Sequence, residues 1–415
     1  MKKSISGAQG ALLLLLGINL FNYIDRQLLA ALEPDIRASF FAANDVNAMT
    51  NTGLYLGSAF FVTYMISAPI LGLLADRFSR WLIIGCAVIL WSLASGGSGL
   101  AATFAILVAT RVFIGIGEGG YGPAAPTILS DLFPIETRGR IMAIFCAAIP
   151  VGSALGYVIG GLVGAHLGWR WAFYLVAPPG LLLGLLCFWQ RDPRVAADHV
   201  VQKAPRRSLR DYLNLFRTRS YLINCIAMTL MTFVTGGLGF WVPAYLRYRN
   251  QSPDVGMTIF GLITVVAGLV STLLGGVIAD KLRSRFPGSY FWVSGIGMVI
   301  ACPIFVVALY VPFPAAWIAM FLAIFFLFLN TGPSNTALAN VSLPAVRATA
   351  FAANIFIIHA FGDVQAFWLL GYIAGHTNMH VAFLFVSVII FASGLVWLIG
   401  VKYLPADTAA VEAQA

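Results

Sequence analysis

The sequence predicts an all-α polytopic membrane protein with twelve transmembrane helices arranged in two pseudo-symmetric six-helix bundles. Its 415 residues are 60% hydrophobic and only 10% charged, with a mean hydropathy of +0.88, whereas soluble domains are about 45–50% apolar and about 25% charged. Twelve apolar segments are each long enough to cross a bilayer, which takes roughly 20 residues. A loop motif also recurs about half a chain later. This composition excludes a secreted disulfide scaffold, a disordered regulator and a cytosolic enzyme.

Six apolar segments precede the one long polar stretch of the chain, and six follow it. The segments span 10–32, 51–75, 81–101, 104–129, 141–164, 170–190, 221–245, 256–279, 290–311, 315–339, 348–374 and 380–403. The first one begins like a signal peptide, but it continues beyond Asp25-Arg26 without a clear cleavage pattern, so we predict a transmembrane helix there. We expect an N-terminal bundle over 1–190, a cytoplasmic linker over 191–220 and a C-terminal bundle over 221–415.

The basic residues predict the orientation of these helices. The side that holds the N-terminus and the even-numbered loops carries 19 of the 25 Lys and Arg residues, and the other side carries four. The remaining two, Arg26 and Arg111, lie within helices. By the positive-inside rule, both termini are expected in the cytoplasm. The net charge of +9 therefore reflects topology and contact with bilayer lipids, and not binding to nucleic acid.

The linker contains a candidate amphipathic helix. Leu209, Tyr212, Leu213 and Phe216 recur at i, i+3, i+4 and i+7, arginines flank them, and Ser208 is a candidate N-cap. This pattern predicts a short basic helix at the cytoplasmic interface of the membrane. The alternative is a solvated linker in which the spacing arises by chance.

The two halves of the chain share a loop motif. The loop after the second segment contains Gly72, Ala75, Asp76 and Arg77, and the loop after the eighth contains Gly276, Ala279, Asp280 and Lys281 at a constant offset of 204 residues. Two arginines in later loops of the halves, Arg138 and Arg347, are offset by 209 residues. A near-constant offset over half a chain indicates two parallel six-helix repeats.

The sequence G-x-x-x-D-R-x-S-R in the first of these loops resembles the signature loop of the major facilitator superfamily. The resemblance implies the major facilitator fold. It also implies a conformational latch that stabilises the outward-facing state on the cytoplasmic side, formed by Gly72, Asp76, Arg77 and Arg138, with Asp280 in the repeated loop. The alternative is that these charges serve only topology, which we expect of Arg80.

Ionisable residues within the predicted helices are the stronger functional signal, because each is costly in a bilayer and usually faces a cavity or a partner. At about 1.5 Å per residue, Asp25, Arg26 and Arg111 lie at similar depth, and Glu118 lies two turns deeper than Arg111 on the same face. His359 and Asp363 share a face of the eleventh helix at i and i+4. We expect these groups to cluster around one hydrated vestibule.

These residue types are suited to proton-coupled anion transport. Burial favours the neutral form of a carboxylate, whereas a nearby arginine favours the charged form. An anion that recruits the arginine would therefore change the proton affinity of the carboxylate. Asp25 and Glu118 are the candidate proton carriers, and Arg26 or Arg111 is the candidate anion-binding group. The alternative is a static Asp25–Arg111 ion pair that only fixes helix packing; the role of Asp363 stays open.

Three motifs resemble those of the Spinster family. They are N-Y-I-D-R over 22–26, T-R-V-F-I-G-I-G-E-G-G-Y over 110–121 and A-I-P-V-G-S-A-L-G-Y over 148–157. The resemblance implies export of lysophospholipids or of sphingosine 1-phosphate, linked to protons in some members. It also implies a substrate cavity lined by Asp25, Arg26, Arg111 and Glu118, with Tyr23 beside them and His359 opposite.

Two further features concern helix geometry. The polar, helix-breaking sequence over 330–335 interrupts an apolar segment, and irregular backbone at membrane depth is tolerated only where it meets protein or a cavity. We therefore expect Asn330, Thr331 and Asn335 near substrate. Glycines at 152, 156 and 160 predict close approach of the fifth helix to a neighbour.

Together these features predict a secondary active transporter that works by alternating access, and the resemblance to the Spinster family implies an amphiphilic anion or zwitterion such as a lysolipid as its substrate. The alternative is a proton-coupled carrier of small polar organic anions or sugars. No Walker, G-x-S-x-G or H-E-x-x-H motif is present, and the five cysteines lie far apart, so we expect no ATP hydrolysis, catalytic residue, metal or cofactor. We expect a monomer in a bacterial-type inner membrane.

Overall fold

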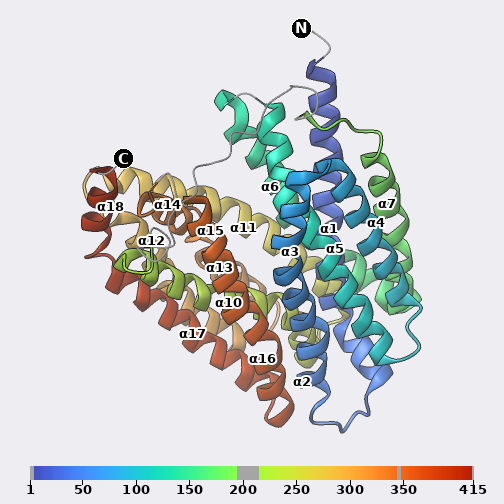
Figure 1. Cartoon of the computed structure of the whole chain (residues 1–415). Helices are drawn as coiled ribbons and strands as arrows, with labels where there is room; N and C mark the ends of the chain where they lie inside the picture. The colour runs from blue at the N-terminus through green and yellow to red at the C-terminus, as the bar shows by residue number, and fades with distance from the viewer. Residues whose placement is uncertain (1–3, 134, 194–214, 344–346, 414–415) are drawn as a thin grey trace. The chain divides into compact units, whose positions relative to one another are not determined.

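The computed structural model describes residues 4–133, 135–193, 215–343 and 347–413, which are nearly all helical (Figure 1). Within these residues, twelve helical stretches are long and apolar enough to cross a membrane, which confirms the predicted fold class. They span Gly7–Phe40, Ala48–Ala75, Arg80–Gly99, Phe104–Leu132, Ile144–Leu167, Trp169–Cys187, Arg219–Tyr248, Pro253–Arg283, Ser289–Tyr310, Ala315–Asn340, Ala350–His376 and Met379–Gly400. The amphipathic helix predicted in the linker falls mostly on 194–214, outside the described residues.

The chain forms two compact units. The first comprises Met1–Gln202 with Phe240–Gly261, and the second comprises Lys203–Gly239 with Leu262–Ala415. The long helix α10 (Arg219–Tyr248) therefore contributes residues to both units, as does α11 (Pro253–Arg283). This division follows packing, whereas the boundaries predicted at 190 and 221 follow the sequence repeat and stay a prediction.

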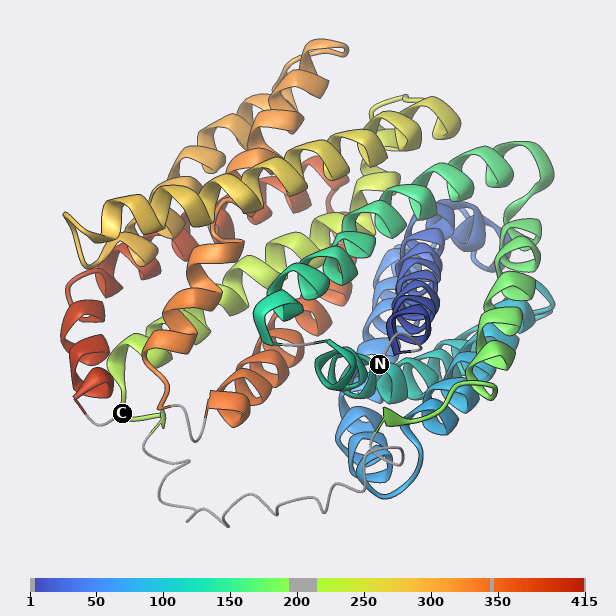
Figure 2. The ribbon, with the colours of Figure 1, turned by 90° about the horizontal axis from the view of Figure 1, so that it is seen from above.

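The first unit is built around α1. Its helices are α1 (Ser4–Phe40), α2 (Ala48–Thr52), η1 (Gly53–Ser58), α3 (Ala59–Arg77), α4 (Arg80–Gly99), α5 (Phe104–Leu132), α6 (Ile135–Leu167) and α7 (Trp169–Cys187). Helix α1 packs against α5, α6 and α7, while α4 packs against α5 and α7; Figure 2 shows α1 (dark blue) nearly end-on. These contacts fix the helices that carry most of the predicted site.

The glycines of α6 let it approach α1 closely. A Cβ atom at Gly152 would stand 2.6 Å from the carbonyl oxygen of Leu20, and one at Gly156 would stand 2.6 Å from that of Ile24. At Gly160 it would stand 2.6 Å from Cβ of a residue of α1. Real Cβ contacts of this length are not tolerated, so the predicted close approach is confirmed. The segment 22–26 of α1 is thus held directly against α6.

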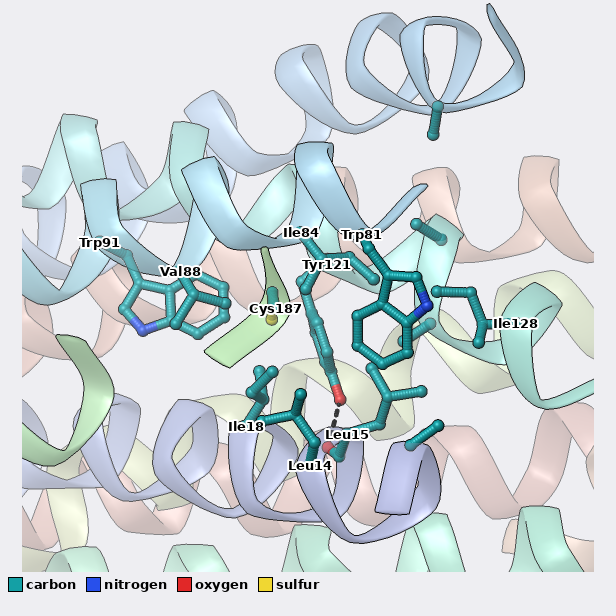
Figure 3. Close-up of a cluster of buried hydrophobic side chains, with 14 of the residues drawn as sticks. Leu14, Leu15, Ile18, Trp81, Ile84, Val88, Trp91, Tyr121, Ile128 and Cys187 are labelled. Atoms are coloured by element: carbon teal, nitrogen blue, oxygen red, sulfur yellow. Dashed lines mark hydrogen bonds between the residues drawn. The ribbon is translucent and has the colours of Figure 1, made fainter. Parts of the chain in front are cut away.

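A buried aromatic cluster joins α1, α4 and α5 (Figure 3). The Tyr121 hydroxyl donates a hydrogen bond of 2.8 Å to the carbonyl oxygen of Leu15, and the ring of Trp91 meets that of Tyr121 edge-on at 5.9 Å. Trp81 of α4 packs in the same cluster. Because Tyr121 lies three residues after Glu118 on α5, this cluster also fixes the rotation of Glu118 about the α5 axis.

Helix α1 continues beyond residue 32, where the sequence predicted its end. Glu33 is fully buried and accepts hydrogen bonds of 2.8 Å from Nε of Arg37 and from Oγ1 of Thr52. The buried carboxylate is compensated by an arginine one turn later and by a hydroxyl of α2. This local compensation lets the helix continue through charged residues to Phe40.

Two helices contain π-helical turns. In η1 (Gly53–Ser58), the N–H of Ala59 bonds to the carbonyl of Leu54, and in η2 (His359–Asp363) the N–H of Val364 bonds to the carbonyl of His359. Each turn inserts an extra residue and so rotates the face of the helix that follows. Such turns are frequent at functional sites.

The second unit contains the remaining helices. They are α12 (Ser289–Tyr310), α13 (Ala315–Phe328), α14 (Thr331–Asn340), α15 (Arg347–Ile358), η2, α16 (Val364–His376), α17 (Met379–Gly400) and α18 (Leu404–Glu412), together with parts of α10 and α11. Helix α12 packs against α13, α14 and α17. The helical structure is interrupted between α13 and α14 at Leu329-Asn330, where the polar sequence that was predicted to be irregular begins.

Candidate functional site

A small cavity in the first unit holds part of the predicted site. Its volume is about 150 Å³, and α1, α3, α5 and α6 contribute its walls. The lining residues are Asn19, Asn22, Tyr23, Arg26, Tyr64, Glu118, Tyr121, Gly122, Phe145 and Ile149. A cavity of about this size admits a benzene-sized group. It can therefore take a polar headgroup, but not a long alkyl chain.

Arg26 and Glu118 form an ion pair in this cavity. Nη2 of Arg26 lies 2.5 Å from Oε2 of Glu118, and Nε lies 2.7 Å from the same oxygen. The Glu118 side chain has no exposed area, whereas that of Arg26 is 19% exposed. Glu118 Oε1 is buried and has no hydrogen-bond partner among the described residues. Arg26 is thus the cation that contacts the buried carboxylate among the described residues, and that arginine is open to the cavity.

Four aromatic rings surround the Arg26 guanidinium. Its Cζ lies 5.2 Å from the ring centroid of Tyr23, 5.0 Å from that of Phe60, 5.8 Å from that of Phe61 and 5.3 Å from that of Tyr64. All four distances lie within the range of cation–π attraction. The guanidinium is therefore held by the rings as well as by Glu118.

Asp25 and Arg111 lie in a second buried cluster, next to α4. Ser95 donates a hydrogen bond to Oδ1 of Asp25, and Arg111 donates one to Oγ of Ser98. The Arg111 guanidinium also lies 5.4 Å from the ring centroid of Phe173. Asp25 Oδ2 and Arg111 Nε are buried without a hydrogen-bond partner among the described residues. The described residues therefore contain no direct Asp25–Arg111 ion pair, which was the static alternative.

The four charged residues are thus divided between two neighbouring clusters. Arg26 and Glu118 line the cavity, whereas Asp25 and Arg111 are not among its lining residues. The reason is helical geometry, since consecutive residues such as Asp25 and Arg26 point about 100° apart around the axis. One turns toward α4, and the other turns toward α3 and α5.

The predicted site residues of the second unit form two groups. His359 and Asp363 are in contact through Nδ1 and Oδ2 at 2.5 Å, which confirms that they share a face. The Asn330 side chain is buried and donates a hydrogen bond of 2.5 Å to the carbonyl oxygen of Leu327. Asn335 is exposed and donates to the carbonyl oxygen of Thr331 at 2.8 Å. The interruption between α13 and α14 is thus flanked by one buried side-chain amide, that of Asn330, and one exposed side-chain amide, that of Asn335.

The predicted latch is described only in part. The side chains of Asp76 and Arg138 lie outside the described residues. Arg77 is exposed, and Asp280 accepts a hydrogen bond of 2.8 Å from the Tyr290 hydroxyl. A Cβ atom at Gly72 would meet Pro123 at 3.6 Å, an ordinary van der Waals contact. Close packing therefore does not require the glycine at position 72.

Arg80, for which the prediction was a role in topology alone, pairs with two carboxylates instead. It is 3% exposed, and its Nη2 lies 2.6 Å from Asp192 Oδ1, while its Nη1 lies 2.7 Å from Asp131 Oδ2. Its backbone N–H also donates to Asp192 Oδ2 at 2.8 Å. The residue ties the start of α4 to the end of α5 and to the chain beyond α7. Hydropathy could not predict this, because both partners are distant from Arg80 in sequence.

The sequence reasoning did not predict several residues around the charged groups. They are Asn19, Asn22, Phe60, Phe61, Ser95, Ser98, Phe145 and Ile149. Ser95 and Ser98 could have been predicted from the sequence, because they lie three residues apart in an otherwise apolar helix and form one polar face.

Comparison with known proteins agrees with this architecture. The model of the Major Facilitator Superfamily matches residues 15–364. The chain is 35% identical to protein spinster homolog 3 of Danio rerio, over 86% of this chain and 75% of that protein. It is 34% identical to the sphingosine-1-phosphate transporter SPNS2 of Mus musculus, over 86% of this chain and 68% of that protein.

A solved structure has the same fold. The crystal structure of a bacterial homolog to the human lysosomal transporter Spinster, in an inward-facing and unoccupied conformation, superimposes with a TM-score of 0.82. The two sequences are 21% identical, and the match covers 98% of each chain.

Proposed function

We propose that this chain moves an amphiphilic anion or zwitterion together with protons. The chain belongs to the Spinster family of the major facilitator superfamily and is thus a membrane transporter. The substrate would be a lysolipid or a sphingosine-1-phosphate-like molecule, and the two six-helix bundles would provide alternating access. The observation that carries this proposal is the Arg26–Glu118 ion pair in a headgroup-sized cavity.

The ion pair supplies a coupling mechanism. An anionic headgroup that enters the cavity competes with Glu118 for the Arg26 guanidinium, which faces the open side. Once displaced, the Glu118 carboxylate has no other cation in contact among the described residues, and burial disfavours its charge. It then takes up a proton, so binding of one anion is linked to binding of one proton. Release of the anion restores the pair and expels the proton.

The second cluster extends this mechanism. Asp25 is a further proton carrier and Arg111 a further group for the anion, because both are buried with a polar atom that lacks a partner among the described residues. Hydroxyls of α4 hold both side chains in the absence of a direct ion pair. A proton on Asp25 would remove the charge that faces Arg111, so the cluster can change charge without a change of helix packing.

We assign the remaining predicted residues to the same transport cycle. Tyr23 lines the headgroup cavity, and His359, Asn330, Thr331 and Asn335 would contact the substrate in the second unit. The latch of Gly72, Asp76, Arg77, Arg138 and Asp280 would stabilise one conformation on the cytoplasmic side. Both termini would be cytoplasmic, because 19 basic residues lie on that side, and the protein would act as a monomer in a bacterial-type inner membrane.

The test is transport by purified protein in proteoliposomes, with and without an inward proton gradient. The substrates offered are lysophosphatidylglycerol, sphingosine 1-phosphate, and a panel of small carboxylates and sugars. Gradient-dependent movement of a lysolipid, lost in Glu118→Gln and kept in Glu33→Gln, supports the proposal. Glu33 is a matched control, because its carboxylate is also fully buried but pairs with Arg37 outside the cavity. Movement of only the small solutes would establish the alternative substrate class instead.

A further inference from the structure

The exchange of Arg26 between Glu118 and the anion does not by itself require the four aromatic rings around Arg26. They come from two helices, since Tyr23 is on α1 while Phe60, Phe61 and Tyr64 are on α3. The rings also contact one another: Phe60 stacks on Tyr64 at 6.2 Å and meets Phe61 edge-on at 5.0 Å. They form an ordered wall that encloses one cation, which we call the Arg26 cage.

Two backbone features place the rings in this position. The π-helical turn η1 ends directly before α3, and its extra residue sets the rotation with which positions 60, 61 and 64 face α1. Helix α5 then approaches α3 at Gly115, where a Cβ atom would overlap the carbonyl oxygen of Phe60 and the hydroxyl of Thr63. This approach brings Glu118 next to the rings. The cage is therefore a feature of the fold and not a chance contact of one rotamer.

Cation–π attraction depends on the net charge that the rings face. While Glu118 is ionised, its carboxylate 2.5 Å away offsets much of the guanidinium charge. When Glu118 is protonated, the rings face an uncompensated cation in a partly desolvated site, where each favourable ring contact is strongest. The rings therefore stabilise the protonated form of the site more than the ionised form.

We propose that the Arg26 cage holds the guanidinium in the cavity when Glu118 is protonated, and thereby sets the proton occupancy of the empty carrier. This inference rests on the proposed function and names the residues that position its anion-binding group. Without the rings, a protonated Glu118 would leave Arg26 as a bare charge inside the membrane, which is costly. With them, a larger fraction of the empty carrier holds a proton on Glu118 at a given pH, and the arginine of that fraction stays in the cavity, ready for the anion.

Other titratable groups interact with Glu118 or with its neighbours and enter the same equilibrium. Those that interact with Glu118 itself are Asp25, Arg26 and Tyr23 from α1 and Arg111 from α5. Those that interact with Tyr23 are Tyr64 from α3, Tyr121 from α5 and Cys146 from α6. The rings of Phe60 and Phe61 carry no titratable group and can be altered without changing any of these charges, which makes them the right place for a test.

The test varies the electron density of one ring at constant shape. Phenylalanine analogues with one, two and three fluorine atoms are incorporated at Phe60, because fluorination weakens cation–π attraction while keeping the ring. The protonated carboxyl band of Glu118 is followed by infrared titration of the substrate-free full-length protein, and it is identified by its loss in Glu118→Gln. We expect the titration midpoint to move stepwise to lower pH, by about one pH unit over the series.

Matched controls separate the cage from simple packing. The same series at Phe113, which is on α5 and 50% exposed, should leave the midpoint unchanged. Tyr64→Phe, which keeps the ring, should stay close to wild type, whereas Tyr64→Leu should move the midpoint in the same direction as fluorination. A midpoint that is the same for every analogue at Phe60, or an equal shift at Phe113, would overturn the inference.

Failure of the cage and failure of the proposed function give different results. If the Phe60 series is flat while Glu118→Gln still abolishes proton-driven transport, the cage is wrong and the coupling role of Glu118 stands. If Glu118→Gln transports normally, the proposed function fails, whatever the infrared titration gives.

Discussion

Replacement of Glu118 by Gln tests whether an anion and this carboxylate compete for Arg26. In the wild type, binding of a monovalent anion displaces Glu118, which takes up a proton, so the bound state holds one proton more than the free state. Linkage then requires the dissociation constant to rise about tenfold for each pH unit above the midpoint of Glu118 protonation. Glu118→Gln removes both competitor and proton at nearly constant size. Its binding should lose the pH dependence that Glu118 causes and, above that midpoint, should be tighter than that of the wild type.

The choice of ligand decides whether this slope can be interpreted. Lysophosphatidylglycerol is suitable because its phosphodiester keeps one negative charge, whereas a phosphate monoester changes charge near about pH 6. Binding is measured by scintillation proximity with the protein in nanodiscs, between about pH 5 and about pH 9. Glu33→Gln serves as the control, because its side chain also has no exposed area but contacts Arg37 and Thr52. It should keep the wild-type slope.

Two results would refute this reasoning. If wild-type affinity does not change with pH, no proton is taken up on binding, and the competition does not occur. If Glu118→Gln binds more weakly than the wild type at high pH, the carboxylate supports the anion site instead of opposing it. Either result would leave the ion pair as a structural contact, of the kind that costs about 3–5 kcal/mol when one partner is removed.

Two further predictions concern packing and the buried arginine network. Gly156→Ala places a carbon 2.6 Å from a backbone carbonyl oxygen of α1 and should cost about 1–3 kcal/mol, seen as a lower thermal unfolding midpoint in detergent. Gly268→Ala meets no heavy atom within 4 Å and should stay within about 0.5 kcal/mol. Asp192→Asn leaves buried Arg80 poorly compensated and should cost about 3 kcal/mol, more than Asp131→Asn, whose side chain is 42% exposed. Equal losses in the two Asn variants would contradict the argument from burial.

The fold could be predicted from sequence because the features that determine it, hydropathy and a repeated motif, can be read along the chain. Hydropathy gives the twelve helices, and a motif repeated 204 residues later indicates two related halves. The errors fell where a side chain meets a partner distant in sequence. The first helix continues past residue 32 because Glu33 accepts a hydrogen bond from Thr52 of the next helix. Arg80 is buried because it forms an ion pair with Asp192. Neither pairing leaves a trace in local composition.

The sequence could predict the depth of each site residue in the membrane, but not the rotation of each helix about its axis. Depth arithmetic placed Arg26 and Arg111 at the same level, so it could not decide which arginine pairs with Glu118. The choice depends on the rotation of α1, which the glycine contacts with α6 fix. The aromatic cage was beyond sequence reasoning for a similar reason, since the π-helical turn before Phe60 changes the face of α3 and no hydropathy pattern reports it.

Charge balance in the two clusters leads to a last prediction. Asp25, Arg26, Arg111 and Glu118 are two acids and two bases, so the empty site is neutral when all four are ionised. Net charge within a bilayer is costly, and uptake of one proton with one monovalent anion keeps the site neutral throughout the cycle. Transport of lysophosphatidylglycerol should therefore be electroneutral.

The measurement clamps internal and external pH at different values and imposes a potassium diffusion potential with valinomycin. The rate of lysophosphatidylglycerol transport should not respond to the potential, because no net charge crosses the membrane. Zwitterionic lysophosphatidylcholine, carried with the same proton, would move one positive charge, and its rate should respond with a driving force of about 2.3 kcal/mol per 100 mV. If the potential instead drives the anion and leaves the zwitterion unaffected, no proton accompanies either lipid, and the pairing of one proton with one headgroup is wrong.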